Sequence, residues 1–266
     1  MIKAAVLGSP ISHSLSPILH RTAYQLLEVE GEYQAIDVTS DTFNSFLNRS
    51  QGEGWNAFSL TMPLKEQLFD VDFPIQFDEI ATSIRSANTL FDLQGSPRAT
   101  STDFSAFQRL LTPLIAPGTS VAILGGGGTA RAALGAIATK NPDVSVYLRG
   151  GAESPRAVEL RALFPHVTLR FLEFGESLFD AEIVINTTPK GAADLYANPA
   201  IAGSQSLFES LYYPWPTEIA RAALEHGVHI ISGKELLIEQ AMDQIALMTG
   251  KSFDFEVMRE KLREVI

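Results

Sequence analysis

The chain has 266 residues, 45% of them apolar, which is enough to bury one large core or two modest ones. It contains no cysteine, which excludes disulfides, thiolate metal sites and a cysteine nucleophile, and which suits a reducing cytoplasm. The formal charge of −11 disfavours nucleic acid and anionic membranes as partners, so any anionic ligand must be held by local cations.

Metal and membrane signals are also missing from the sequence. The five histidines lack the spacing of a metal-binding motif of the HExxH kind, so we expect no bound metal. No apolar run approaches the roughly 18 residues that span a bilayer, and we expect a soluble protein. The short apolar run at residues 1–7 is interpreted as a first strand rather than a signal peptide.

Strand-like runs alternate with helical patterns over residues 1–102, and this alternation predicts an α/β layer. The predicted strands are 3–7, 33–38, 55–60 and 87–93, and the predicted helices are 17–27, 41–47 and 65–69.

Two serines precede the first of these helices. Pro17 suits the first helical position and Ser16 suits the N-cap, so capping alone accounts for Ser16. Ser14 places a second hydroxyl beside the N–H groups of the helix start. An anion or polyol site at this point is therefore the alternative interpretation.

Lys65 falls in the first turn of the helix predicted at 65–69. A cation at the positive end of a helix costs about 0.3 to 1 kcal/mol, and a local rule broken without local gain often marks function. We therefore interpret Lys65 as a candidate for proton exchange.

Asp103 has two interpretations. It suits the N-cap of a helix predicted at 104–111, and on sequence alone this capping role is favoured. Alternatively, it pairs with Lys65, because both residues follow strand segments that we expect to be neighbours, at the sheet edge where ligands collect. A Lys–Asp pair there could hold a substrate hydroxyl and relay its proton.

A second series of strands begins after residue 118. The strands are predicted at 120–124, 144–148, 167–172, 183–186, 207–211 and 228–231. Helical patterns lie between several of them, which predicts a doubly wound parallel sheet.

Four consecutive glycines, starting at Gly125, separate the first strand of this series from a helix. Gly125 permits a tight turn, Gly127 lets the backbone approach a pyrophosphate, and Ala130 keeps the helix close to the sheet. An ordinary glycine-rich turn is the alternative, but the strand before and the helix after supply the context that a dinucleotide site requires. We predict a dinucleotide phosphate site.

The second strand of the series ends at Arg149. An NAD site usually places Asp or Glu about 20 residues beyond the first glycine, whereas an Arg accommodates the 2′-phosphate of NADP. Arg149 therefore favours NADP, the alternative being a solvated loop cation. The segment from Gly125 to Arg156 is mildly basic within an acidic chain, which suits a phosphate-rich ligand.

Two helices predicted at 234–248 and 255–265 follow the last strand, and we expect them to return to the first domain. The first has an apolar stripe interrupted by Gln240 and Gln244. A buried amide without partners costs about 1 to 3 kcal/mol. Either a polar-lined cleft lies under this helix or the glutamines lie at the edge of the stripe in water.

Several motifs, in the same order along nearly the whole chain, resemble the shikimate dehydrogenase family. They are GSPISHSLSP (8–17), SLTMPLK (59–65), SANTL (86–90), STD (101–103), GGGGTAR (125–131), NTTPKG (186–191), LYYPWPT (211–217) and GKELLIEQA (233–241). The resemblance implies a two-domain α/β protein. Residues 1–102 would form a substrate domain completed by 236–266, and residues 103–235 would form a Rossmann-like, doubly wound NADP domain.

The same resemblance implies an activity and a set of site residues. The activity is the reversible, NADP-dependent reduction of 3-dehydroshikimate to shikimate, in the biosynthesis of chorismate and aromatic amino acids. The catalytic pair falls on Lys65 and Asp103. The substrate-binding residues fall on Ser14, Ser16, Thr61, Asn88, Tyr212 and Gln240. The cofactor-binding residues fall on Gly125, Gly126, Gly127, Gly128, Thr129, Arg131, Arg149, Asn186, Thr187, Thr188 and Gly233.

The chain departs from the family at four places. Ser101 stands where Asn is usual, Phe104 where Gly is usual and Glu209 where Asp is usual, and Leu148 precedes Arg149 where Asn is usual. Ser101 reaches less far toward a substrate hydroxyl and Phe104 is bulky, so these departures bear on turnover and substrate choice.

Two alternatives to the implied activity stay open. One is a dehydrogenase for quinate or a related polyol acid, with a different cofactor preference. The other is a catalytically degenerate NADP-binding regulator, against which the presence of both Lys65 and Asp103 argues. We expect a small-molecule substrate and a monomer or homodimer.

Overall fold

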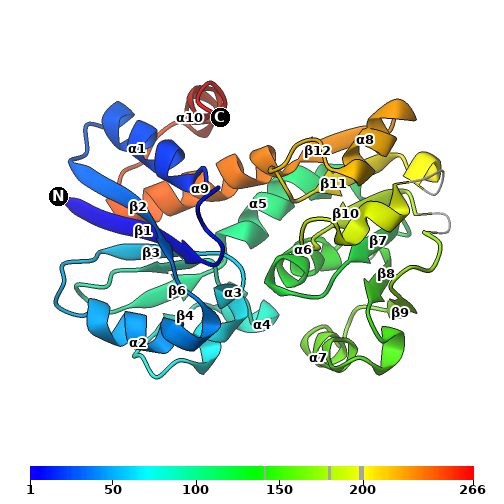
Figure 1. The fold of residues 1–266 in the computed structure, drawn as a ribbon, viewed down its shortest axis with the longest axis horizontal. Helices are drawn as coiled ribbons and strands as arrows, with labels where there is room; N and C mark the ends of the chain where they lie inside the picture. The colour runs from blue at the N-terminus through cyan, green and yellow to red at the C-terminus, as the bar shows by residue number, and fades with distance from the viewer. Residues whose placement is uncertain (141, 179–180, 198–200) are drawn as a thin grey trace. The chain divides into compact units, whose positions relative to one another are not determined.

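The computed structural model describes residues 1–140, 142–178, 181–197 and 201–266. They form two compact units, shown in Figure 1: Met1–Ser105 with Leu237–Ile266, and Ala106–Leu236. The boundaries fall within two helices, α5 (Thr102–Leu111) and α9 (Gly233–Thr249).

The first unit is built on a mixed six-stranded sheet in the order β2-β1-β3-β5-β6-β4. Its strands are β1 (Ile2–Gly8), β2 (Gly31–Asp37), β3 (Ala57–Leu60), β4 (Gln76–Phe77), β5 (Thr89–Phe91) and β6 (Arg98–Thr100). β1 runs parallel to β2 and β3, whereas β5 is antiparallel to both of its neighbours, β3 and β6.

Helices cover both faces of this sheet. The helices before α9 are α1 (Ser16–Leu26), α2 (Ser40–Ser50), α3 (Leu64–Gln67) and α4 (Glu79–Ile84), and α10 (Phe255–Arg263) follows it. Side chains alternate along β1, so that Ala5 and Leu7 pack with α2, α3 and α4, while Ala4 and Val6 face a cluster with α1 and α9. α10 packs beside α1 through Met258 and Leu262 (Figure 1).

Three short elements of the first unit were not predicted from the sequence. β4, α4 and β6 are two, six and three residues long, which is too short for a hydrophobic period to be recognised. The strand predicted at 87–93 is shorter in the structure, where only the three residues of β5 pair with neighbouring strands.

The second unit contains the predicted doubly wound parallel sheet, in the order β12-β11-β10-β7-β8-β9. The strands are β7 (Ser120–Leu124), β8 (Asp143–Leu148), β9 (Leu169–Glu173), β10 (Ile183–Asn186), β11 (Ser206–Glu209) and β12 (His229–Ser232). All five pairings are parallel. The strand order reverses between β7 and β10, and the carboxyl ends at such a switch point are where open α/β sheets bind ligands.

Apolar side chains fill the layers of the second unit. Its helices after α5 are α6 (Gly128–Ala138), α7 (Pro155–Leu163) and α8 (Glu218–Glu225). One cluster joins Leu124 and Val184 of the sheet to Ile219 and Ala223 of α8. Among the helices of the described residues, none combines the length and the apolar character that crossing a membrane requires.

Gly233, the first residue of α9, lies against another backbone segment of the second unit. A Cβ atom at this position would lie 2.3 Å from the carbonyl oxygen of Ser210 and 2.7 Å from the carbonyl carbon of Leu211. Neither backbone atom can move away as a flexible side chain could. Close packing therefore accounts for this glycine, whatever else it contacts.

We expect Gly233→Ala to lower the free energy of unfolding by about 1 to 3 kcal/mol, the usual cost of overpacking. Thermal denaturation measures the effect. Gly203→Ala is the matched control, because a Cβ there would meet no atom of the described residues within 4 Å. Equal melting temperatures for the two variants would contradict the prediction.

Candidate active site

Three segments of the first unit meet at one edge of its sheet. Lys65 follows β3 and Asp103 follows β6, while Asn88 comes directly before β5. Because β5 is antiparallel to both neighbours, its amino end lies at the same edge as the carboxyl ends of β3 and β6. The strands predicted at 55–60 and 87–93 are neighbours, since β3 pairs with β5. Asp103, however, follows the unpredicted β6, and the intervening β5 brings Asn88 beside the two residues.

Lys65 and Asp103 form an ion pair at this edge. Lys65 Nζ donates to Asp103 Oδ2 at 2.6 Å, and the two side chains are 14% and 5% exposed. α5 begins at Thr102, so Asp103 lies in its first turn and is not its N-cap. The capping interpretation of Asp103 is therefore wrong, because the carboxylate accepts hydrogen bonds from Lys65 and Asn88 instead.

The amide of Asn88 has a defined orientation. The backbone N–H of Thr102 donates to Asn88 Oδ1 at 2.7 Å, which requires the amide oxygen on that side. Asn88 Nδ2 then points the other way and donates to Asp103 Oδ1 at 2.9 Å. Asn88 is almost fully buried, so this donor competes little with water.

The two serines near the start of α1 lie differently from the prediction. α1 begins at Ser16, so Ser16 is the first helical residue and the N-cap position is Leu15, which makes no side-chain capping bond. Ser14 Oγ accepts a hydrogen bond from the backbone N–H of Ser16 at 3.3 Å. Ser14, rather than Ser16, therefore provides the hydroxyl that satisfies a donor at this helix start.

Thr61 joins the segment after β1 to the segment after β3. Its backbone N–H donates to Leu7 O at 2.9 Å, and a Cβ at Gly8 would lie 2.3 Å from Thr61 Cγ2. The lysine-bearing segment and the serine-bearing segment therefore leave the sheet at the same edge, as neighbouring parallel strands require.

Gln240 and Gln244 of α9 are both buried against polar partners, which excludes the alternative in which they lie in water. Gln240 Oε1 accepts from Asn88 Nδ2 at 3.2 Å. Gln244 Nε2 donates to Thr89 Oγ1 at 3.1 Å. The apolar stripe of α9 therefore faces the core, and the two glutamines interrupt it where the helix covers the polar side chains of Asn88 and Thr89.

Gln244 also contacts a fully buried histidine. Its Oε1 lies 3.2 Å from His20 Nε2, and the His20 ring stacks on Tyr33 with 3.9 Å between ring centroids. Burial lowers the pKa of His20 from 6.5 to about 3, an effect that the bond to Gln244 only partly offsets. His20 is therefore a neutral core residue, and nothing in its sequence context distinguished it from the other histidines.

Tyr212, the sixth predicted substrate residue, belongs to the second unit, whereas the other five belong to the first. Of the departures from the family, Ser101 is buried, and its Oγ makes no hydrogen bond within the described part of the chain. Phe104 is half-buried in the first turns of α5.

The glycine loop of the second unit follows β7 at the switch point of the sheet. Gly125 has φ +101°, a conformation that other residues rarely adopt, and a Cβ there would lie 2.9 Å from Thr187 Oγ1. A Cβ at Gly126 would lie 2.8 Å from Leu148 Cδ2. Gly125 therefore requires a residue without a side chain, whereas at Gly126 the Leu148 side chain would have to move. α6 begins directly after this turn, at Gly128.

The segment after β10 is held beside this loop by buried polar contacts. Thr187 Oγ1 donates to Leu124 O at 2.7 Å, and Thr188 Oγ1 donates to Asn186 Oδ1 at 2.7 Å. Asn186 Nδ2 donates to both carboxylate oxygens of Glu209, at 3.1 and 2.9 Å. Burial raises the pKa of Glu209, although hydrogen bonds from Leu211, Asn186 and Thr217 oppose this shift.

The cations near the glycine loop are partly neutralised. Arg131 is buried and forms an ion pair with Glu159 at 2.5 Å, and Arg156 reaches the same carboxylate at 3.3 Å. Glu159 follows the mildly basic segment from Gly125 to Arg156 and contributes a negative charge to it, so the region is less basic than predicted. Arg149 lies exposed at the end of β8.

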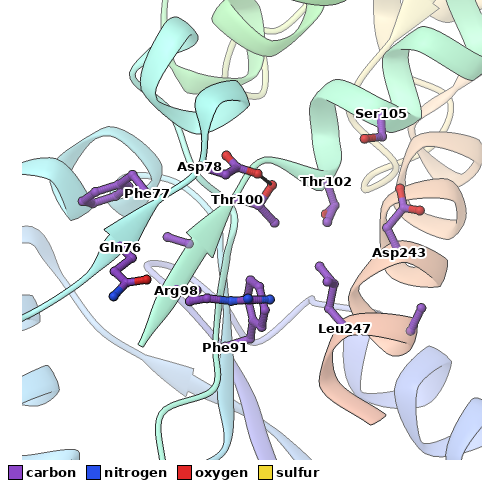
Figure 2. Close-up of a pocket in the computed structure, with 12 residues that line it drawn as sticks. Gln76, Phe77, Asp78, Phe91, Arg98, Thr100, Thr102, Ser105, Asp243 and Leu247 are labelled. Atoms are coloured by element: carbon purple, nitrogen blue, oxygen red, sulfur yellow. Dashed lines mark hydrogen bonds between the residues drawn. The ribbon is translucent and has the colours of Figure 1, made fainter. Parts of the chain in front are cut away.

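A separate cavity of about 580 Å³ lies on the α9 side of the first sheet (Figure 2). Neither Lys65 nor Asp103 lines it. Its lining carries the carboxylates of Asp78 and Asp243 and a single guanidinium, that of Arg98, which lies 4.7 Å from the ring centroid of Phe91. Two carboxylates against one cation do not suit an anionic acid. Among the described residues, no group of histidine, aspartate or glutamate side chains is arranged to hold a metal ion.

A parallel sheet in this strand order, with a glycine loop at its switch point, defines a dinucleotide-binding α/β protein, and a lysine–aspartate ion pair lies at the sheet edge of the other unit. Comparison with known proteins gives the family. The model of the shikimate dehydrogenase substrate binding domain matches residues 6–90. The shikimate dehydrogenase (NADP(+)) of Methanosarcina mazei is 30% identical over 275 residues, covering 98% of this chain and 97% of that protein. The chain belongs to the shikimate dehydrogenase family.

Solved structures agree with this assignment. The Mycobacterium tuberculosis shikimate dehydrogenase is 33% identical, with a TM-score of 0.85 over 99% of this chain and 100% of the other. The Thermus thermophilus shikimate 5-dehydrogenase, solved in complex with NADP(H) and shikimate, is 26% identical, with a TM-score of 0.81 over 100% of both chains.

Because His20 is buried and neutral, we expect the stability of the fold to decrease at acidic pH. The unfolded chain takes up a proton on His20 near its ordinary pKa of 6.5, whereas the folded protein does so only near 3, so stability falls as the pH drops between these values. From pH 7 to pH 5, this one group should remove about 2 kcal/mol of unfolding free energy. Urea denaturation at the two pH values measures the loss.

The His20→Leu variant should lose less stability between pH 7 and pH 5 than the unsubstituted protein. His226→Gln, which changes an exposed histidine, serves as the control and should retain the full loss. An unchanged pH dependence in His20→Leu would contradict the assignment of this effect to His20.

Proposed function

We propose that this protein catalyses the reversible, NADP-dependent reduction of 3-dehydroshikimate to shikimate. The observation that carries the proposal is the Lys65–Asp103 ion pair, held at one edge of the sheet in the unit that contains the matched substrate binding domain. Relatives named shikimate dehydrogenase (NADP(+)), and a related structure with NADP(H) and shikimate bound, support the choice of substrate and cofactor.

The second unit suits the phosphates of a dinucleotide. Gly125 and Gly126, where an added Cβ would contact neighbouring side chains, expose bare backbone at the switch point of the sheet. We assign the cofactor to the glycine loop and Thr129, to Arg131 and Arg149, to the segment 186–188 and to Gly233. When bound, NADPH supplies a hydride. We propose residues 103–235 as the NADP domain.

The first unit suits the binding and protonation of a hydroxy acid. We propose residues 1–102 with 236–266 as the substrate domain. Lys65 would donate a proton to the carbonyl oxygen of 3-dehydroshikimate as a hydride reaches the carbonyl carbon, so that the ketone becomes the hydroxyl of shikimate. In the reverse direction, Lys65 takes this proton back. Oδ2 of Asp103 holds the ammonium of Lys65 in place, and Oδ1 of Asp103 accepts a hydrogen bond from Asn88.

The remaining predicted residues would orient the substrate. We assign Ser14, Ser16 and Tyr212 to its carboxylate and Thr61, Asn88 and Gln240 to its hydroxyls. The buried hydroxyl of Ser101 is shorter than the amide usual in the family, and it bears on the choice between shikimate and a related acid such as quinate. Kinetics with each acid and each cofactor distinguish these possibilities, and a clear preference for quinate with NAD would overturn the proposal.

A regulator that binds NADP without catalysis is the second candidate. The Lys65–Asp103 pair argues against it, because both residues that the proposed proton transfer requires are present and in contact. Mixing the protein with shikimate and NADP and following nicotinamide absorbance separates the two candidates. We also propose a cytoplasmic location, supported by the absence of cysteine, and a monomer or homodimer.

We expect Lys65→Ala to lower kcat by about 10² to 10⁴-fold, the usual contribution of a positioned acid or base, with a much smaller change in the KM for shikimate. Steady-state absorbance assays measure both constants. Lys251→Ala, which removes an exposed cation of the same unit, should leave them unchanged. Full activity in Lys65→Ala would refute the role of the lysine.

We expect Arg149→Ala to raise the KM for NADP by about tenfold or more while the KM for NAD changes little, because only NADP carries the 2′-phosphate. The preference for NADP should shrink accordingly. Lys140→Ala, an exposed cation after α6, is the control. If both cofactors lose affinity equally, Arg149 does not read the phosphate.

A further inference from the structure

A continuous chain of hydrogen bonds runs from the Lys65–Asp103 pair into the core of the first unit. It passes through Asn88 and Thr89 of the segment around β5 and reaches Gln244 of α9. Every side chain in this chain of contacts beyond Lys65 is buried. None of the site assignments made above includes Thr89 or Gln244.

The amide of Gln244 is fully used. Its Nε2 donates to Thr89 Oγ1 at 3.1 Å and to the backbone oxygen of Asn88 at 3.3 Å. Its Oε1 accepts from Ser59 Oγ at 2.8 Å and lies 3.2 Å from His20 Nε2. Because a backbone carbonyl can only accept, the contact with Asn88 O requires Nε2 on that side of the amide and leaves Oε1 for Ser59 and His20.

The direction of each bond follows from that orientation. Thr89 Oγ1 accepts from Gln244, so its own hydrogen is directed to Asn88 Oδ1 at 3.1 Å or to Thr102 Oγ1 at 3.2 Å. Asn88 Oδ1, which accepts on this side, leaves Nδ2 to donate to Asp103 Oδ1. A reversed Asn88 amide would place its NH₂ group against the backbone N–H of Thr102, a donor against a donor.

The far end of the chain is anchored in the core. Tyr33 donates to Ser59 Oγ at 2.6 Å, which directs the Ser59 hydrogen to Gln244. His20, whose neutral ring stacks on Tyr33, offers Nε2–H to the same amide oxygen. Helix α1 and strands β2 and β3 therefore all hold one side chain of α9.

We propose that Gln244 is a positioning residue for the Lys65–Asp103 pair, acting through Thr89 and Asn88. The proposal rests on the proposed function of that pair. Without Gln244, Thr89 can turn its hydroxyl elsewhere and the amide of Asn88 is held less firmly. The carboxylate of Asp103 would then hold the ammonium of Lys65 in a wider range of positions, which slows proton transfer more than it weakens substrate binding.

The test is a double-substitution cycle with Gln244→Met and Thr89→Val, both close in volume to the residues they replace. We expect each single variant to lower kcat by about fivefold to tenfold, with the KM for shikimate within about twofold. The double variant should be no slower than the slower single variant, because both act through the same contact. The solvent deuterium isotope effect on kcat should rise in all three.

Ile245→Ala is the matched control, since Ile245 is the next residue of α9 and its side chain is fully buried in an apolar cluster. It should lower the melting temperature at least as much as Gln244→Met, with kcat within about twofold and an unchanged isotope effect. If the fold-decreases in kcat of the two single variants multiply in the double variant, or if kcat is unchanged in both single variants, the proposal is overturned.

The side-chain amide resonance of Asn88 in nuclear magnetic resonance spectra provides a readout that does not depend on turnover. It should shift and exchange faster with solvent in Gln244→Met and Thr89→Val and stay in place in Ile245→Ala. If the unsubstituted protein does not oxidise shikimate, the proposed function fails by itself. If it does, and the Asn88 resonance is unmoved in Gln244→Met, the positioning role fails while the function stands.

Discussion

The ion pair between Lys65 and Asp103 is the interaction around which the first unit is organised. Removing two charges from water is costly, and their attraction compensates only when the remaining hydrogen-bonding positions are satisfied. Asn88 fills one such position on Asp103. The antiparallel β5 makes this possible, since its amino end brings Asn88 to the edge where the chain leaves β3 and β6.

The buried amides of Asn88, Gln240 and Gln244 extend the same constraint into the core. A buried polar group without a partner is costly, and a network that satisfies every member fixes one arrangement of side chains. α9 comes from the far end of the chain, and its two glutamines meet the polar side chains of Asn88 and Thr89 at the start of β5. The helix is therefore part of the candidate site as well as of the hydrophobic core.

The second unit presents bare backbone at the switch point of its sheet, where we propose that the phosphates of the cofactor bind. Its glycines fit a turn where side chains would collide, and Glu209 fixes Asn186 beside that turn. The glutamate is one methylene longer than the aspartate usual in the family. It still accepts hydrogen bonds from Asn186, Leu211 and Thr217, so the buried carboxylate is satisfied.

The sequence by itself determined the features that depend on short-range patterns. Apolar runs alternating with helical periods indicated two α/β layers, and the strand, glycines and helix around Gly125 indicated the dinucleotide loop, because such signals lie within a few residues of each other. Only the tertiary structure decided what Asp103 and Gln244 do. Their partners lie 38 and 155 residues away in the chain, at Lys65 and Thr89, and a carboxylate or amide has the same local sequence signature whether it caps a helix, faces water or joins a buried network.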